Sequence, residues 1–585
     1  AADSEYLFDT HEPLDPVAEQ NVEATLRKRA QTILKGRESD PPLVRIVMGD
    51  EIGSEGGGAT INGFASSRRA FHDYLRACVA QLGTNAAYFG VADVEELPFL
   101  DEPGDRPGVH AGRLYYASER FKFIHTALYY AQITRAAERI FPRVQTYCNF
   151  SPHPPMFGQH MNGSDWFALT RHGGANMAWG ECWASGGDGK GSWGFNGFEV
   201  VGYYAAWVEC AARVRGGLPA GFYVVGTTGG SDRKIFSLLG RGIHWITAYS
   251  WGPMYSGAEG SNFWSENPKV YGQIARATHV IGPADAIIAR GRREPRRAGV
   301  LYNRAHEIWN GAEGGFQTDR LLQFTALSHA HVPAEILLEE DCTDKGLAGY
   351  LVLYIQGYNF EGRTLDALRR WVEAGGVLVA AAGTALRDES NTATGADEAL
   401  FGARQRPAGM SRGGWHPQVL PDHEPIDKLT LQATDLTPAL TADVIGVKVV
   451  LEPTTGTPVG TFADGRCAAV MRTLGKGRTL LFGFQPGMLY KGSAPGGSRY
   501  MLERLPLLAQ PAQLALGRMR VEYSEPQTEV WLFEHEGEAA VTLNNFAHFL
   551  EPAERAAVLT VQTDLPVKEV FSTLKGPLRW TREGD

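Results

Sequence analysis

Two acidic residues stand where predicted buried strands end, and both fit the role of a catalytic carboxylate. Glu51 follows the apolar run 43–48 in the sequence GDE, and Glu181 stands between two tryptophans in WGECW. A carboxylate exposed at a strand end but surrounded by apolar groups has a raised pKa, which suits a general acid. Two such groups on different strands could protonate a leaving oxygen and attack an anomeric carbon, the chemistry of a glycosidase. The simpler interpretation, in which Glu51 caps a helix, stays open.

Aromatic and polar residues gather around the same strand ends and are expected to bind the substrate. Nine of the 13 tryptophans lie between residues 166 and 309, and several flank predicted strand ends rather than helix faces. Indole rings there can stack on the apolar faces of a sugar, although packing in the core is the alternative for each tryptophan. The candidate substrate-binding residues are Asp50, Asn149, Trp179, Trp183, Tyr249 and Trp251.

The remaining motifs give weaker indications of chemistry. The six cysteines are far apart and form no CxxC pair, so neither a zinc site of the usual kind nor a disulfide scaffold is expected. His153, His160 and His172 could bind a metal, but substrate contacts or surface positions are the preferred interpretation. Cys182 beside Glu181 could be a nucleophile, yet no histidine that would orient it is evident, which favours a buried thiol. We therefore expect no metal and no cofactor.

Composition places the chain among globular proteins and argues against several other classes. Of 585 residues, 43% are hydrophobic and 21% are charged, and the formal net charge is -10. The negative charge argues against a nucleic-acid-binding protein, which usually presents a basic face, and the basic run 292–297 is expected to be a solvated linker. No apolar run approaches the roughly 18 residues that a membrane span needs. We expect a soluble protein, with the compartment open between cytoplasm and periplasm.

Predicted strands and helices alternate about five times in residues 1–290, which is typical of the later part, strands 4–8, of a (β/α)8 barrel. The strands are mostly apolar, as expected for a parallel sheet covered on both faces. After a predicted linker at 281–299, residues 299–510 continue as a flavodoxin-like α/β domain with an irregular stretch at 383–421, and residues 512–585 as a small C-terminal β-sandwich. The barrel strands are predicted at 43–48, 144–148, 175–179, 221–225 and 244–249.

The predicted barrel lacks its first three strands. Three βα units of about 30 residues each would have to precede Leu43, whereas 42 residues do, and they contain one predicted helix. A five-stranded fragment would expose two sheet edges. We therefore expect an upstream segment or a further chain to complete the barrel.

Five short motifs occur in the order GDEIG, AFHDYL, VQTYCNFSP, ITAYSW and NPKVYGQIARATHVIG. Their order and spacing resemble glycoside hydrolase family 42, the three-domain β-galactosidases of clan A, over about residues 15–575. The resemblance implies that Glu51 is the acid/base and that 146–150 and 249–251 match the ends of strands 5 and 8. It also implies an amidotransferase-like trimerisation domain at 299–510 without the amidotransferase nucleophile, a homotrimer, and an oligosaccharide or glycoside substrate.

Two departures from that family affect the expected chemistry. Asp50 stands where the family has an asparagine that contacts the sugar 2-hydroxyl, so this chain could read the 2-position differently. Predicted strand 7 ends in VGTT at 225–228, without the family's nucleophilic glutamate, and Glu181 on strand 6 is the nearest carboxylate at the barrel mouth. We assign Glu181 as the nucleophile and expect it about 5–5.5 Å from Glu51, as a retaining mechanism requires. Glycoside hydrolase family 164, with β-mannosidase activity, is an alternative relative.

Three functional hypotheses remain open at this point. The first is a retaining, exo-acting β-glycosidase, β-galactosidase-like or β-mannosidase-like, that uses Glu51 and Glu181. The second is a carbohydrate-binding or scaffolding relative that has lost its nucleophile. The third is an inverting or eliminating enzyme with one catalytic carboxylate. Hydrolysis of a panel of aryl β-glycosides would separate the first from the second.

Overall fold

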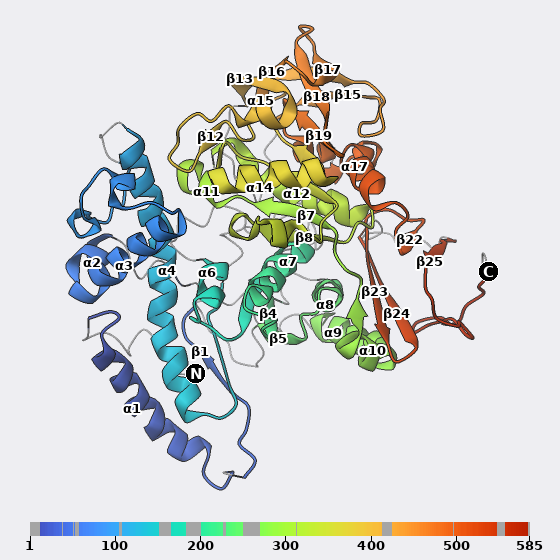
Figure 1. Cartoon of the computed structure of the whole chain (residues 1–585). Coiled ribbons are helices and arrows are strands. Elements are labelled where there is room, and N and C mark those ends of the chain that lie inside the picture. Colours follow the sequence, from blue (N-terminus) through green and yellow to red (C-terminus); the bar gives the residue numbers. More distant parts are fainter. Residues whose placement is uncertain are drawn as a thin grey trace.

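The computed structural model shows three regions that lie side by side (Figure 1). The barrel region occupies the lower part of this view with a long helix at its left, a large mixed sheet lies above it, and the last strands lie at the right. The structure describes residues 12–37, 39–50, 52, 58–103, 108–150, 165–182, 200–225, 230–249, 269–311, 313–411, 424–494, 497–546 and 556–582.

Five short parallel strands form an arc in the first region, in agreement with the predicted alternation of strands and helices. β1 pairs with β2, and β3, β4 and β5 form a second sheet in that order. The two sheets meet where the N–H groups of Asn176 and Met177 donate to the carbonyl oxygen of Thr146 at 3.2 and 3.1 Å. The guanidinium carbon of Arg45 lies 3.7 Å from the centre of the Trp245 ring, so β1 and β5 face each other across the arc. The bounds are β1 Val44–Val47, β2 Val144–Tyr147, β3 Ala178–Cys182, β4 Ala220–Val225 and β5 Trp245–Tyr249.

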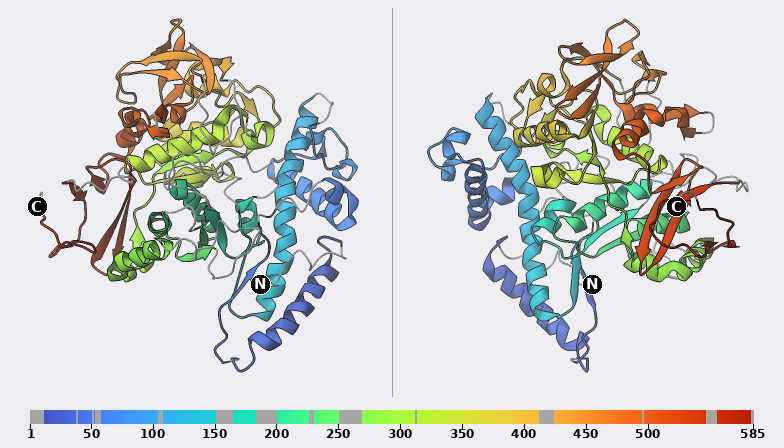
Figure 2. Two further views of the ribbon diagram at one scale, coloured as in Figure 1. Left: turned by 180° about the vertical axis from the view of Figure 1, so that it is seen from behind. Right: turned by 45° about the vertical axis from the view of Figure 1, so that its right-hand side comes forward.

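Helices connect and cover these strands. Asp15 caps the start of the first helix: its side chain accepts the Val17 N–H at 2.8 Å, and Pro16 is the first helical residue, two common start signals. The longest helix, α4, runs the height of the region in both further views (Figure 2). The α-helices described in this region are α1 Pro16–Ile33, α2 Gly58–Gly63, α3 Ala65–Gln81, α4 Val109–Ile140, α6 Trp166–Arg171, α7 Val200–Arg213, α8 Ser231–Gly240, α9 Lys269–Ile281 and α10 Asp285–Arg290.

The second region is built on one large mixed sheet. Its parallel part has the strand order β8-β7-β9-β11-β19, in which the first strand of the region, β7, has the second, β8, on one side and the third, β9, on the other. This is the doubly wound order of flavodoxin-like folds. The parallel strands are β7 Ala298–Tyr302, β8 Ala334–Leu338, β9 Val352–Ile355, β11 Val377–Ala380 and β19 Gly477–Phe482, and the flanking helices include α11 Arg304–Asn310, α12 Phe316–His329, α14 Gly362–Ala374 and α17 Pro506–Leu516.

Antiparallel strands extend this sheet beyond β19. Two elements of this part of the chain, helix α15 Ala396–Phe401 and strand β13 Ala403–Met410, lie inside the stretch predicted to be irregular at 383–421. That prediction is wrong for this part, because β13 gains its order from an antiparallel ladder with β16 rather than from local sequence. The antiparallel strands are β13, β14 Asp427–Leu431, β15 Leu440–Val444, β16 Val447–Pro453, β17 Thr457–Phe462 and β18 Cys467–Leu474.

Residues 292–297, predicted to be a solvated linker, are instead structured, so that prediction is wrong. Arg292 and Arg293 form strand β6, which pairs with β23 (Thr528–His535). Arg293 and Arg296 form ion pairs with Glu209 of α7, the former at 2.9 Å. Burial alone would raise the pKa of Glu209, but Arg296 and Arg293 outweigh burial and lower it. The ion pairs with Glu209, which is distant in sequence, therefore explain why two arginines of this segment are not solvated.

The last region consists of short antiparallel strands. β23 and β24 (Glu538–Asn545) form a hairpin whose two turn residues, Glu536 and Gly537, both have positive φ, as a type I′ turn requires. The hairpin is tied to the barrel region by Glu529, which is buried and accepts a hydrogen bond from Ser237 of α8. The other strands are β22 Val521–Tyr523, β25 Leu559–Val561, β26 Phe571–Ser572 and β27 Gly576–Pro577. Among the described residues, none of the helices has the length and apolar composition to span a membrane.

Candidate functional site

The carboxyl ends of β1, β2 and β3 bring together three of the predicted site residues. Beyond the last pair of β1 and β2, the ladder continues: Met48 N–H donates to Tyr147 at 2.8 Å, and Asn149 N–H donates to Gly49 at 2.9 Å. These backbone bonds place Asn149 beside Asp50. The side chain of Glu181 reaches the same place from β3.

Asn149 bridges the two carboxylates. Its Nδ2 donates to Asp50 Oδ1 at 2.8 Å and to Glu181 Oε2 at 2.8 Å. The two accepting oxygens are therefore no farther apart than twice 2.8 Å. The predicted separation of about 5–5.5 Å concerns Glu51 and Glu181, and Glu51 lies outside the described residues. Asn149 and Glu181 are each 4% exposed, whereas Asp50 is exposed. The cluster is thus open on the Asp50 side.

An aromatic group packs next to these carboxylates. Trp179 stacks on Tyr147 with ring centres 4.2 Å apart and meets Tyr223 edge-on at 4.9 Å. The two phenol oxygens lie 3.3 Å apart. Burial raises the pKa of Tyr223, and the hydrogen bond with Tyr147 and the negative charges of Asp50 and Glu181 raise it further. Both carboxylates therefore lie within electrostatic reach of the Tyr223 phenol.

Trp179, a predicted sugar-binding residue, lies inside the arc of strands. Its side chain is 2% exposed, and the room for its indole comes from Gly221, where an added Cβ would lie 2.1 Å from the ring. Trp179 precedes Glu181 by two residues on the same strand, so both side chains face the same side of the sheet. In this structure, the environment of Trp179 corresponds to the core-packing alternative.

Strand β3 differs from its predicted bounds in a way that matters for Glu181. The strand was expected at 175–179 and to end before Gly180, but it extends from Ala178 to Cys182, and Glu181 lies within it opposite Tyr223 of β4. Gly180 does not break the strand. A Cβ at Gly180 would lie 2.9 Å from Val208 and 3.0 Å from Phe222, so this glycine allows close packing rather than a turn.

Several predicted site residues lie outside the described part of the chain. These are Glu51, Trp183 and Trp251, as well as the side chain of Tyr249, whose backbone ends β5. Of the three histidines considered as a metal site, only His172 is described, and burial lowers its pKa. Within the described ranges, no group of three or more His, Cys, Asp or Glu side chains could hold a metal ion.

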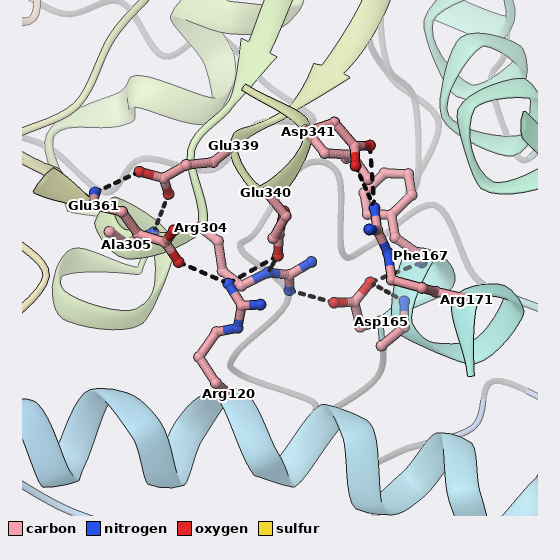
Figure 3. A network of polar contacts seen from close by, with 12 residues as sticks. Arg120, Asp165, Phe167, Arg171, Arg304, Ala305, Glu339, Glu340, Asp341 and Glu361 are labelled. Carbon is pink, nitrogen blue, oxygen red and sulfur yellow. Dashed lines mark hydrogen bonds and ion pairs between the residues drawn. The ribbon is translucent and has the colours of Figure 1, made fainter. Parts of the chain in front are cut away.

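A second charged cluster, which sequence reasoning missed, joins the barrel region to the large sheet (Figure 3). Arg304, at the start of α11, forms ion pairs with Asp165 and Glu340. Arg120 of α4 forms ion pairs with Glu340 at 3.0 Å and with Glu361 at 3.1 Å. Burial alone would raise the pKa of Glu340, but Arg304 and Arg120 outweigh burial and lower it. The only sequence signal is the acidic run that follows β8.

Glu339, the first residue of that acidic run, binds two backbone groups rather than a cation. Its carboxylate accepts the N–H of Ala305 at 2.9 Å and that of Glu361 at 2.7 Å, at the starts of α11 and α14. Burial and the charge of Glu361 raise the pKa of Glu339 to about 8, while the two backbone hydrogen bonds act in the opposite direction. The side chain is 1% exposed. We therefore treat this interdomain cluster as structural and the Asp50–Asn149–Glu181 cluster as the candidate site.

Comparison with solved structures identifies known proteins of the same fold. A β-galactosidase from Rahnella sp. R3 aligns with a TM-score of 0.67 and 13% identity, over 94% of this chain and 80% of that chain. A catalytic mutant of a GH42 β-galactosidase from G. stearothermophilus aligns at 0.63 and 13%, over 90% and 76%. An α-L-fucosidase from Paenibacillus thiaminolyticus aligns at 0.55 and 13%, over 97% and 77%.

These likenesses confirm that the chain has the fold of the family 42 β-galactosidases, as the sequence motifs indicated. A scan against protein-family models and a search of curated protein sequences give no match. Since the same overall fold occurs in a β-galactosidase and in an α-L-fucosidase, the substrate must be argued from the side chains of the site.

Proposed function

We propose that this protein is a glycoside hydrolase that removes a terminal sugar by a two-carboxylate mechanism. The observation that carries the proposal is Glu181, buried and held on the Asn149 amide beside Asp50 where three parallel strands end, with Glu51 as the next residue after Asp50 in the chain. Barrel enzymes place their chemistry at this end of the strands. The fold shared with β-galactosidases adds support.

In the proposed reaction Glu181 is the nucleophile and Glu51 is the acid/base. Glu51 gives a proton to the leaving oxygen while Glu181 attacks the anomeric carbon and forms a covalent glycosyl-enzyme. Glu51 then removes a proton from water, which attacks the same carbon and releases Glu181. Glu51 is the chain neighbour of Asp50, and Asp50 lies at the mouth beside Glu181.

The proposed substrate is a β-galactoside or β-mannoside that is cleaved from its end. Asp50 stands where the resembled family has an asparagine. We therefore propose that a carboxylate, rather than an amide, accepts the hydrogen bond from the sugar hydroxyl near the reacting carbon. Trp183, Tyr249 and Trp251 are proposed as further contacts with the sugar. Asn149, whose amide donates to Asp50, is proposed to line the polar side of the sugar site.

A mechanism-based label tests the assignment of the nucleophile directly. A 2-deoxy-2-fluoro glycoside with a good leaving group should form a slowly hydrolysed ester, and peptide mapping should find the sugar on Glu181. Glu51→Gln should lose hydrolysis of glycosides with poor leaving groups and retain more activity on activated aryl glycosides, since acid assistance matters most for a basic leaving oxygen. A label on another residue would overturn the assignment of Glu181. Equal loss on both substrate types would give Glu51 another role.

A carbohydrate-binding relative without catalysis is the second candidate. It is favoured by the end of β4, where Val225 is followed by Gly226-Thr227-Thr228 and no carboxylate stands at the position of the resembled family's nucleophile. A panel of aryl β-glycosides separates the two candidates. Calorimetric binding of a sugar without any hydrolysis would favour the binding protein.

We also propose that the protein assembles as a homotrimer through residues 299–510. This proposal rests on the resemblance to the three-domain family. Sedimentation velocity at micromolar concentration should show a species of three times the 63.8 kDa chain mass. A monomer under those conditions would contradict it.

A further inference from the structure

The two-carboxylate scheme leaves the role of Asn149 unexplained. Its side chain is buried and neutral, and Nδ2 donates to one carboxylate from each neighbouring strand end. The reverse orientation of the amide would place Oδ1 against two carboxylate oxygens, so the two acceptors fix which way the amide points. In the observed orientation Oδ1 accepts no hydrogen bond from the described residues. Binding both carboxylates therefore outweighs an unsatisfied acceptor.

A second asparagine near β2 shows what an asparagine with a purely structural role does. Asn176 accepts the Thr146 N–H at 2.7 Å, and its amide donates to the Val144 carbonyl at 3.2 Å and to Glu138 at 3.0 Å. It thus joins backbone segments. Within the described ranges, the hydrogen bonds of the Asn149 side chain go only to carboxylates, so its role is directed at Asp50 and Glu181.

We propose that Asn149 is a positioning residue that sets the spacing of Asp50 and Glu181 and allows both to stay ionised at that spacing. Like charges so close repel, and each then favours binding a proton. A hydrogen bond from an N–H group to an ionised carboxylate is stronger than one between neutral groups and opposes that effect. The inference rests on the proposed function for its role in catalysis, because an ionised Glu181 can act as nucleophile and proton donation is left to Glu51.

Other titratable and charged groups also surround the cluster. Tyr147 of β2 and Tyr223 of β4 face it, and burial raises the pKa of both phenols, so both are neutral donors at ordinary pH. The positive charge of Arg45 of β1 lowers the pKa of Tyr147, an effect smaller than that of burial. The Arg45 guanidinium donates a hydrogen bond to Gln145 and lies over the ring of Trp245. Glu51 follows Asp50 in the chain and lies outside the described residues.

The first test measures stability and needs no substrate. Asn149→Leu keeps the approximate size of the side chain and removes both N–H donors, and Asn176→Leu is the matched control. We expect the loss in Tm caused by Asn149→Leu to be at least about twofold larger at pH 8 than at pH 5, because at pH 5 one carboxylate can take a proton and bridge to the other. The control should lose a similar amount at both pH values. An equal loss at both pH values for Asn149→Leu would overturn the proposal.

Asn149→Asp keeps the proposal testable if Asn149→Leu does not fold. A third carboxylate at this point should give a protein whose Tm falls more steeply than that of wild type as the pH rises above about 6. A Tm profile parallel to that of wild type would overturn the proposal.

The second test uses activity and separates this inference from the proposed function. The acid limb of the kcat/KM profile of Asn149→Leu on an aryl β-glycoside should move up by about one pH unit, with kcat reduced more than KM is changed, while Asn176→Leu keeps the wild-type profile. An unshifted acid limb would remove Asn149 from the positioning role even if hydrolysis is confirmed. Wild type without hydrolysis would refute the proposed function, while the pH-dependent Tm would still decide the role of the amide.

Discussion

Two charged clusters of this molecule solve the problem of buried carboxylates in different ways. At the barrel mouth, Asn149, a neutral donor, binds Asp50 and Glu181, and Asp50 is open to solvent. In the interdomain cluster the donors to Glu340 are the guanidinium groups of Arg304 and Arg120, which are 4% and 17% exposed. The cluster at the mouth therefore binds its carboxylates through a neutral amide, whereas the interdomain cluster pairs its carboxylates with cations and joins two regions.

The largest effect on activity is expected from Glu181→Gln. This change removes the proposed nucleophile but keeps an oxygen that can accept the hydrogen bond from Asn149, so hydrolysis should fall by about a thousandfold or more with little change in Tm. Initial rates on aryl β-glycosides and thermal unfolding would measure both. Glu138→Gln is the control, since Glu138 contacts Asn176 instead. Activity within tenfold of wild type would rule out Glu181 as the nucleophile.

The largest effect on stability is expected from Arg304→Met. The change leaves Asp165 and Glu340 buried without this cation, and breaking a buried ion pair by removing one partner typically costs about 3–5 kcal/mol. Urea unfolding should show the loss, with kcat per folded molecule unchanged. Arg370→Met is the control, because Arg370 and Asp344 are 49% and 71% exposed. A loss no larger than that of the control would mean that the interdomain pairs do not hold the regions together.

A pH-dependent effect of intermediate size is expected from Glu339. Burial and the nearby Glu361 raise its pKa from 4.5 to about 8, so the folded protein binds a proton more tightly than the unfolded chain does. The stabilisation from this proton is complete below about pH 4.5 and is lost as the pH rises through about 8. Glu339→Gln, which removes the titrating group, should flatten the decline in unfolding free energy between pH 5 and 8. A decline as steep as that of wild type would assign it to other groups.

Much of the fold could be predicted from sequence, because buried parallel strands are short apolar runs with clear boundaries. The same logic pointed to Glu181 and Asn149, since polar residues after such runs meet at one edge of the sheet. Gly180 was misread as a strand end because sequence alone does not distinguish a turn glycine from one that admits Val208.

The interdomain cluster could not be predicted for a different reason. Arg120 and Glu340 are separated by 220 positions in the chain, and no local pattern connects them. The same holds for Arg296 and Glu209, whose pairing turned an expected linker into a structured segment. A charged residue in isolation is expected on the surface, so only the tertiary structure reveals that these arginines pack against carboxylates and are largely removed from solvent.

The smallest effect is expected from Asp341→Asn, the neighbour of Glu340 in the same acidic run. Asp341 accepts hydrogen bonds from Arg171 at 3.0 and 3.1 Å, and the two side chains are 39% and 34% exposed. Water and salt screen such a pair, so its loss should cost less than about 1 kcal/mol and the difference from wild type should shrink between about 0.05 and 0.5 M NaCl. Glu340→Gln, one residue away and buried between two arginines, should cost several times more and depend little on salt. If both variants lost the same free energy with the same salt dependence, burial would not be what distinguishes the pairs that hold the two regions together.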